Sequence, residues 1–243
     1  MHDENDAGRA RHAQVAQRIA GARRRGARFP ATLLALLAPA FAAGVGTALA
    51  DVAQRNDVEL KAALAAKPDA ARGATLYGTC AACHGPDGGG VADGSIPAIA
   101  GQPQRVLVKQ LADFRRSQRL DIRMEHFADR RHLEGAQDIA DVAAHAAGLV
   151  RATPAGIGDG SKLAAGGRAW IARCAGCHGA TGQADAARAL PRLAGQHAAY
   201  LERQLLDAAA GRRPNMAASH RAVLKVSSED EIAGIADYLS RMK

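Results

Sequence analysis

Two short motifs carry the residue types in this chain that are best suited to chemistry. In a C-x-x-C-H segment, two thiols can add to the vinyl groups of a haem, and the histidine that follows can reach the iron. The spacing fits because both sulfurs must meet one edge of the porphyrin while the next side chain turns beneath it. The sequence predicts two covalently bound c-type haems. Their attachment residues are Cys80, Cys83, Cys174 and Cys177, and their first iron ligands are His84 and His178.

Paired cysteines have two other common uses. Thioredoxin-like redox chemistry places C-x-x-C beside a βαβ unit, and no such strand pattern is visible here. Two C-x-x-C pairs can also hold a tetrahedral zinc ion. However, a histidine follows each pair, and each pair lies in its own copy of a repeated unit, which favours haem attachment. All four cysteines belong to the motifs, so none is left for a structural disulfide.

A tandem repeat sets the domain organisation. Cys80 and Cys174 are 94 residues apart, and a shift of 94 residues aligns many other positions without a gap. The aligned pairs include Gly73 with Gly167, Pro97 with Pro191, Gln102 with Gln196, Gln110 with Gln204 and Arg119 with Arg213. Each copy has roughly 90 residues, a normal domain size. We therefore expect two similar domains, 51–150 and 162–243, joined by a linker at 151–161.

The periodicity within each copy is helical. We expect helices over 69–79, 104–116, 162–173 and 197–210, with another helix closing each copy. Ser228 and Glu231 form a capping-box pattern at the start of the last helix. Because no β-alternating run of useful length occurs, the expected fold class is all-α. Aromatic residues make up only 3% of the chain, and buried porphyrins would supply the apolar centres that aromatics normally provide.

A low-spin electron-transfer haem needs a second axial ligand. Methionine opposite histidine is a common pair at c-type haems and raises the reduction potential. Two of the four methionines, Met1 and Met242, are at the chain ends, which leaves Met124 and Met216, one in each copy. We expect Met124 and Met216 to be the sixth ligands of the two irons.

The repeat itself offers an alternative pair of axial ligands. In the ungapped alignment Met124 falls on Ala218, whereas His126 falls on His220. Two histidines on one iron would give a lower potential than histidine with methionine, so the two assignments differ in function. We retain methionine because loop lengths commonly differ between related copies. The remaining histidines of the mature chain are expected at the surface: His132, His145 and His197.

The N-terminal residues 1–50 have the pattern of an export signal. An arginine-rich stretch precedes the apolar run 29–50, which ends in Ala48-Leu49-Ala50 before Asp51, a small-x-small cleavage pattern. The run is almost long enough to span a bilayer, so an uncleaved anchor is the alternative. Without these residues the chain keeps 25 basic and 21 acidic residues. It has no basic block with interleaved aromatics, which argues against nucleic-acid binding.

Taken together, these motifs resemble class I dihaem cytochromes c, specifically the cytochrome c4 type, over about residues 69–243. The matching segments, besides the two haem motifs, are 97–102, 110–114, 138–143, 191–196 and 231–238. The resemblance implies that two tandem cytochrome c domains each wrap around one covalently bound haem, and that the first and last helices of each domain cross. In the first domain it implies that Gly73 and Tyr77 lie against the closing helix. In the second domain it implies that Gly167 and Trp170 lie near the closing helix. It also implies that the carbonyls of Pro97 and Pro191 accept from the ring N–H of the ligating histidines.

The resemblance implies an electron carrier and not an enzyme. Its expected location is the periplasm, with loose membrane association, and its expected task is to carry electrons in a respiratory chain toward a terminal oxidase. Its partners would be redox proteins: an upstream reductase, a terminal oxidase or a periplasmic dehydrogenase. The alternatives are a cytochrome subunit of a periplasmic dehydrogenase and a dihaem peroxidase. A peroxidase needs one iron with an open or displaceable position, whereas both copies here offer a candidate sixth ligand.

Overall fold

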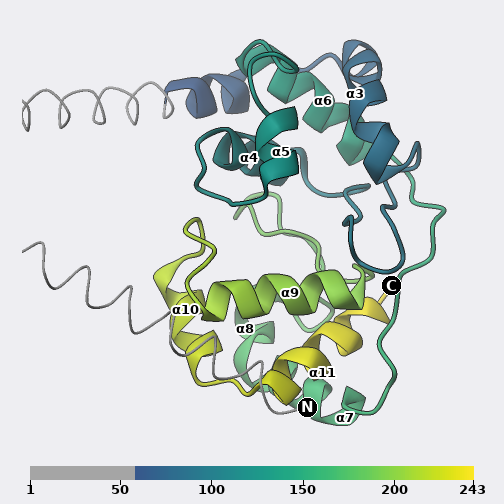
Figure 1. Ribbon diagram of the computed structural model, residues 1–243, viewed down its shortest axis with the longest axis vertical. Helices are drawn as coiled ribbons and strands as arrows, with labels where there is room; N and C mark the ends of the chain where they lie inside the picture. The colour runs from purple at the N-terminus through teal and green to yellow at the C-terminus, as the bar shows by residue number, and fades with distance from the viewer. Residues whose placement is uncertain (1–57) are drawn as a thin grey trace, which may run out of the picture. The chain divides into compact units, whose positions relative to one another are not determined.

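Helices form both domains of the part of the chain that the structure describes. The computed structural model describes residues 58–243 (Figure 1), and the expected export signal at 1–50 lies outside them. The first domain contains α3 (Ala70–His84), α4 (Gln104–Arg115), α5 (Ile122–Phe127) and α6 (Ala136–Gly148). The second contains α7 (Leu163–Arg173), α8 (Ala175–His178), α9 (Ala198–Ala209), α10 (Ala218–Lys225) and α11 (Glu229–Ser240).

The expected all-α fold class is confirmed. Among residues 58–243 no strand occurs, and one isolated bridge joins Asp185 to Leu190. The capping box of Ser228 and Glu231 opens α11 as expected. The helix expected over 69–79 runs on through the haem motif to His84. The sequence did not predict the short helices α5 and α10, which lie between the middle and closing helices of the two domains.

In the first domain α3 crosses α6 at a glycine. A Cβ atom at Gly73 would lie 2.1 Å from the carbonyl oxygen of Asp141 on α6, so only glycine lets the two backbones approach this closely. Tyr77, one turn further along α3, is 3% exposed and packs in the core cluster with Val142 and Ala143 of α6. Gly73 and Tyr77 therefore lie against the closing helix, as expected.

In the second domain the equivalent crossing is shifted by one residue. A Cβ atom at Gly166 would lie 1.9 Å from the carbonyl carbon of Gly234 on α11, whereas one at Gly167 would meet only the ring of Tyr238 at 3.1 Å. Gly167 and Trp170 lie near α11 as expected, but Gly166 makes the closest approach. The second copy therefore has one more residue between this crossing and the haem motif. The helix also breaks there: α7 ends at Arg173, and α8 starts after a turn at Cys174.

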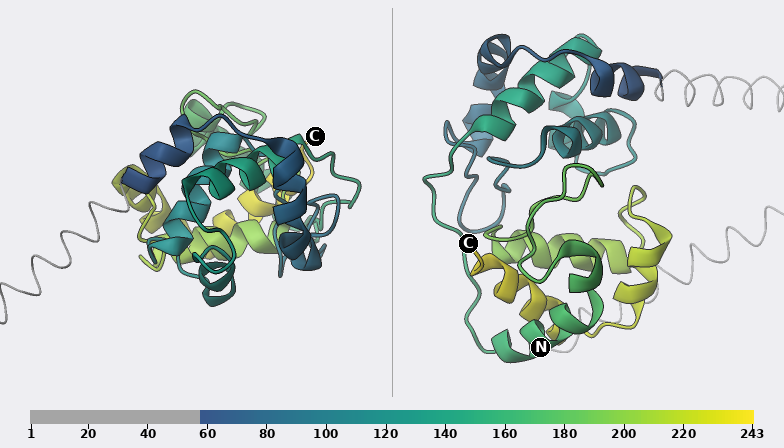
Figure 2. Two further views of the ribbon diagram at one scale, coloured as in Figure 1. Left: turned by 90° about the horizontal axis from the view of Figure 1, so that it is seen from above. Right: turned by 180° about the vertical axis from the view of Figure 1, so that it is seen from behind.

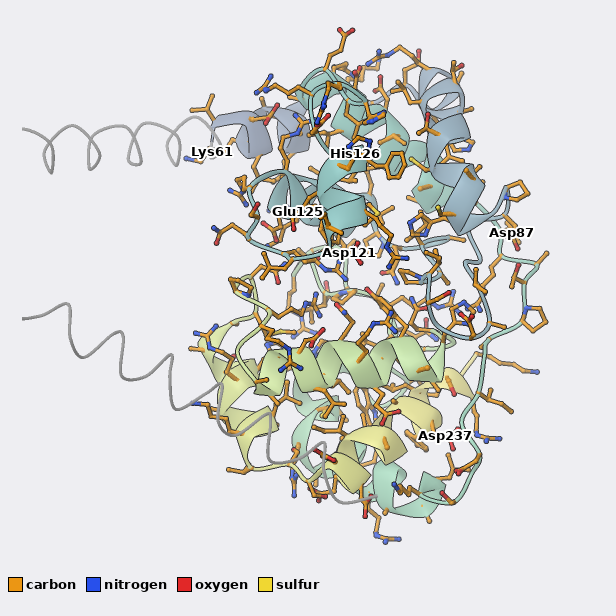
Figure 3. The ribbon with its side chains drawn as sticks, viewed as in Figure 1. Lys61, Asp87, Asp121, Glu125, His126 and Asp237 are labelled. Carbon is orange, nitrogen blue, oxygen red and sulfur yellow. The ribbon has the colours of Figure 1, made fainter. Side chains whose placement is uncertain are left out.

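A buried aspartate on each closing helix fastens the segment that leads into the first helix. Asp141, which is fully buried, accepts from the Asp69 backbone N–H at 2.7 Å and from Arg72 Nε at 2.6 Å. Asp237 accepts from the backbone N–H groups of Gly158 at 3.0 Å and Gly160 at 2.8 Å (Figure 3). These contacts fix where α3 and α7 begin, and therefore where the two haem motifs lie.

The segment 151–161 connects the domains and is held by both of them. Asp87 of the first domain accepts from the backbone N–H groups of Ala152 at 2.9 Å and Thr153 at 2.7 Å. Arg241, next to the C-terminus, donates to the carbonyl oxygen of Gly158 at 2.7 Å. The two views in Figure 2 follow this segment from the end of α6 to the start of α7. None of the described helices has the length and apolar character needed to cross a bilayer.

His197 is a buried residue of the interface between the domains, so its expected surface position was wrong. Its side chain has no solvent exposure. Its Nε2 lies 2.8 Å from the carbonyl oxygen of Gly89 in the first domain, and its Nδ1 accepts from the Gly156 backbone N–H at 2.9 Å. The first domain and the connecting segment bury this ring. The pattern of residues within one repeat copy does not predict contacts with the other domain.

Candidate functional site

The two haem motifs have the same arrangement of buried and exposed thiols. Cys80 and Cys174 are half-buried and pack against the core clusters of their domains, whereas Cys83 and Cys177 are exposed. Burial raises the pKa of the Cys80 and Cys174 thiols. A flat group bonded to both sulfurs of a motif would therefore have one side in the core and one edge at the surface, where another redox protein can approach it.

In the first domain His84 is held as an iron ligand should be. The ring is 6% exposed, and its Nδ1 lies 2.9 Å from the carbonyl oxygen of Pro97, as the resemblance implied. Burial lowers the pKa of His84, which favours the neutral imidazole that binds metals. Within residues 58–243 no protein group bonds its Nε2, so that atom is free to bind iron.

Glycine follows each motif because the chain turns sharply there. Gly85 has a φ of 77° and Gly179 a φ of 74°, both in the left-handed region that favours glycine. In the first domain the carbonyl oxygen of Gly85 accepts from the Tyr77 hydroxyl at 2.9 Å. In the second domain the indole N–H of Trp170 donates to the carbonyl oxygen of Ala180 at 2.9 Å. These bonds hold the chain just after each candidate iron ligand.

In the second domain His178 has different neighbours. Its Nδ1 is buried and has no hydrogen-bond partner in the described part of the chain, so the contact expected from the Pro191 carbonyl is not made. Its Nε2 lies 3.3 Å from Nε2 of His220 on α10. The difference has a local cause, since His84 ends one continuous helix whereas His178 ends the separate short helix α8.

The expected sixth ligands lie between the middle and closing helices of their domains. Met124 is half-buried on α5, and Met216 is half-buried just before α10. Asp121, which was not among the expected site residues, caps α5 by accepting from the backbone N–H groups of Arg123 at 3.1 Å and Met124 at 3.3 Å. The signal was available, because aspartate is a favoured residue just before a helix.

The alternative histidines do not share one environment. His220 is half-buried and faces His178, whereas His126 is exposed on α5 (Figure 3). The Nε2 of His126 lies 3.2 Å from Nε2 of His132, which is not an expected iron ligand. The structure therefore brings one of these two histidines, His220, next to a motif histidine.

The side chains fit a haem better than a bare metal ion. In the described part of the chain no three His, Cys, Asp or Glu side chains group closely enough to hold a metal ion, so the zinc alternative has no site there. The buried Nδ1 atoms of His178 and His220 and the buried Nε of Arg213 have no partners within residues 58–243. A haem supplies an iron and carboxylates, which are groups that such polar side chains need.

Comparisons with known proteins agree with this site. The cytochrome c family model matches residues 70–147 and again 163–243. Cytochrome c4 of Azotobacter vinelandii is 33% identical over 192 residues, which cover 70% of this chain and 88% of that protein. The thiosulfate dehydrogenase electron acceptor of Stutzerimonas stutzeri is 34% identical over 173 residues, with 67% of this chain and 78% of that protein covered.

A solved structure has the same fold. The crystal structure of reduced recombinant cytochrome c4 from Pseudomonas stutzeri superposes with a TM-score of 0.65 at 28% identity. The match covers 73% of this chain and 100% of that one. The likeness therefore extends over both domains and both motifs.

Proposed function

The chain belongs to the cytochrome c family as a dihaem member of the cytochrome c4 type, and we propose that it carries electrons between redox proteins of the periplasm. Two covalent c-type haems are its cofactors, and it is an electron-transfer protein, not an enzyme. Each haem supplies a one-electron iron couple whose potential depends on the axial ligands and surroundings. The observation that carries the proposal is the pair of C-x-x-C-H motifs, each with its second cysteine exposed.

For the irons we propose His84 with Met124, and His178 with Met216. Both methionines are half-buried and lie between the middle and closing helices of their domains. They are also the only methionines of the sequence that are not near a chain end. His220 is the competing ligand at the second iron because its Nε2 already lies 3.3 Å from that of His178. His126 is the corresponding alternative at the first iron.

The periplasm is the proposed location, with residues 1–50 as the export signal and 51–150 and 162–243 as the two domains around a linker at 151–161. Covalent haem attachment supports an exported protein, as does the Ala-x-Ala pattern before Asp51. Fractionation of cells that express the full chain tests this. We expect a haem-stained band in the periplasm whose N-terminal residue is Asp51. A band in the membrane fraction that begins at Met1 would favour the uncleaved anchor.

The proposed partners are an upstream reductase and a terminal oxidase of a respiratory chain, with loose association to the membrane surface. A relative named as an electron acceptor of thiosulfate dehydrogenase supports a periplasmic dehydrogenase as a second candidate donor. Stopped-flow mixing separates the two. Rapid oxidation of the reduced protein by oxidase-containing membranes supports the respiratory assignment, whereas rapid reduction by a dehydrogenase and its substrate supports the other. A fast reaction of one haem with peroxide would instead indicate a peroxidase.

A further inference from the structure

The second domain contains a half-buried arginine that forms no ion pair with an acidic side chain among residues 58–243. Arg213 lies between α9 and α10, and its Nε is buried without a hydrogen-bond partner in the described part of the chain. The acids nearest to it are paired with other groups. Asp207 bonds Arg212 at 2.8 Å, and Asp113 accepts from Arg116 at 2.6 Å and from Asn215 at 2.8 Å.

The repeat mate of Arg213 in the first domain shows what is missing. Arg119 donates to the side-chain oxygen of Gln110 at 2.6 Å, to that of Gln204 at 3.0 Å and to the Tyr200 hydroxyl. Gln204 is the repeat mate of Gln110, so the glutamine that would serve Arg213 by symmetry bonds Arg119 instead. Arg213 therefore lacks the partner that Arg119 has.

The surroundings of Arg213 favour an anion. Burial and, to a smaller extent, repulsion from Arg119 together lower the pKa of Arg213 to about 10. A buried guanidinium that lacks a counter-charge is costly, and its planar fork of donors suits a carboxylate. Burial lowers the pKa of His220, the residue that faces His178, and the positive charge of Arg213 adds to that effect. Arg213 thus lies on the same side of the domain as the candidate ligands of the second iron.

We propose that Arg213 binds a propionate carboxylate of the second haem and raises the reduction potential of that haem. The proposal rests on attachment of this haem at Cys174 and Cys177. The anion has to come from outside the polypeptide, because the nearest protein carboxylates are paired elsewhere, and each haem carries two propionates. A fixed positive charge beside a haem favours the reduced iron, which carries one positive charge fewer.

Potentiometry of R213Q tests the proposal. We expect one of the two midpoint potentials to fall while the other stays within error. R212Q is the matched control. It removes the same charge at the neighbouring position, where the Arg212 side chain is 63% exposed. A shift in R213Q no larger than that in R212Q would overturn the proposal. The mass of each protein is measured as well. A wild-type chain that lacks the mass of its second haem would refute the attachment site itself and not the role of Arg213.

A second variant keeps the test decisive if R213Q does not fold with two haems. R213K keeps the charge but cannot offer the planar pair of donors. We expect its second midpoint potential to stay close to that of the wild type, while the propionate bending band in the resonance Raman spectrum shifts. An unchanged propionate band in R213K, together with an unchanged potential, would show that Arg213 does not touch the propionate.

Discussion

Gln196 and Ala98 exchange two hydrogen bonds across the interface between the domains. The amide oxygen of Gln196 accepts from the Ala98 backbone N–H at 3.0 Å, and its amide nitrogen donates to the Ala98 carbonyl oxygen at 2.8 Å. Gln102 makes the same exchange with Arg192 in the opposite direction, at 2.9 and 2.7 Å. Gln102 and Ala98 are the repeat mates of Gln196 and Arg192, so the duplicated units contact each other through equivalent surfaces.

Replacing Gln196 with alanine should destabilise the interface. Gln196 is 6% exposed, and its loss leaves the backbone N–H and carbonyl of Ala98 without partners in a buried place. We expect the free energy of unfolding to fall by about 2–4 kcal/mol, since each of the two unsatisfied buried groups costs roughly 1–3 kcal/mol. Denaturant titration of the holoprotein measures the change. Q102A is the control, and its half-buried site should cost less because water can replace the amide there.

Gly73→Ala should destabilise the first domain, although alanine is normally the better helix residue. The added Cβ would lie 2.1 Å from the carbonyl oxygen of Asp141, a backbone atom that cannot move without shifting α6. We expect a loss of about 1–3 kcal/mol, typical of overpacking. Gly78→Ala on the same helix is the matched control because nothing lies within 4 Å of its added Cβ. That variant should gain up to about 1 kcal/mol from helix propensity. Equal effects of the two substitutions would contradict the crossing at Gly73.

Acid should weaken the holoprotein through His197. Burial lowers the pKa of His197 below its ordinary value of about 6.5. The hydrogen bond to the Gly89 carbonyl and the charge of Asp93 favour the proton. Burial and the charge of Arg151, whose Nη2 lies 3.4 Å from Nδ1, outweigh them. The neutral ring accepts from the Gly156 N–H and bonds the Gly89 carbonyl, and a protonated ring cannot accept. The unfolded chain takes up a proton as the pH falls through about 6.5 while the folded one resists, so stability present above that pH is lost below it.

The unfolding free energy of wild type and H197Q, measured from pH 8 to pH 5, isolates this contribution. The other histidines with lowered pKa values, His84, His178 and His220, are present in both proteins, so the difference between the two curves reports on His197. We expect the wild type to lose more stability than H197Q as the pH falls below 6.5. Parallel curves over this range would mean that His197 is not held in its neutral form.

The chain without haem should be largely unfolded. The core clusters of both domains pack against the first cysteine of each motif, so removing the haem takes away their apolar neighbour. Protein made without the haem-attachment machinery should lose most of its helical circular dichroism signal. Apo-protein with a native-like helical spectrum would show that the polypeptide cores suffice, and that the low aromatic content has another cause.

The sequence predicted the haem motifs and the main helices because each depends on local spacing. The first-domain crossing was expected from the family resemblance alone. The resemblance named Trp170 as the second-domain counterpart of Tyr77, but the ungapped repeat does not. The ungapped shift of 94 pairs Tyr77 with Ile171, which is 56% exposed, whereas the buried equivalent is Trp170. One extra residue before Cys174 causes this, and an alignment without gaps cannot contain it. Helices as short as α5 and α10 have too few turns to show a periodicity.

The axial ligands can be assigned from the weak red absorption band of ferric haem with a methionine–iron bond. If Met124 and Met216 are both ligands, the wild-type protein shows this band at full strength, and M124A and M216A each lose about half of it. H220A and H126A should then keep the full band. The test is most informative at the second iron. There His220 competes with Met216, because its Nε2 lies 3.3 Å from that of His178.

The opposite result would have a functional meaning. If M216A keeps the spectrum of the wild type and H220A changes it, the second iron has two histidine ligands while the first keeps Met124. A haem with two histidines has a lower potential than one with histidine and methionine. The two haems would then differ widely in potential, and the first haem, with the higher potential, would be reduced first. Potentiometry of the wild type therefore checks the spectral assignment: two close, high midpoints support methionine at both irons, and one low midpoint supports His220.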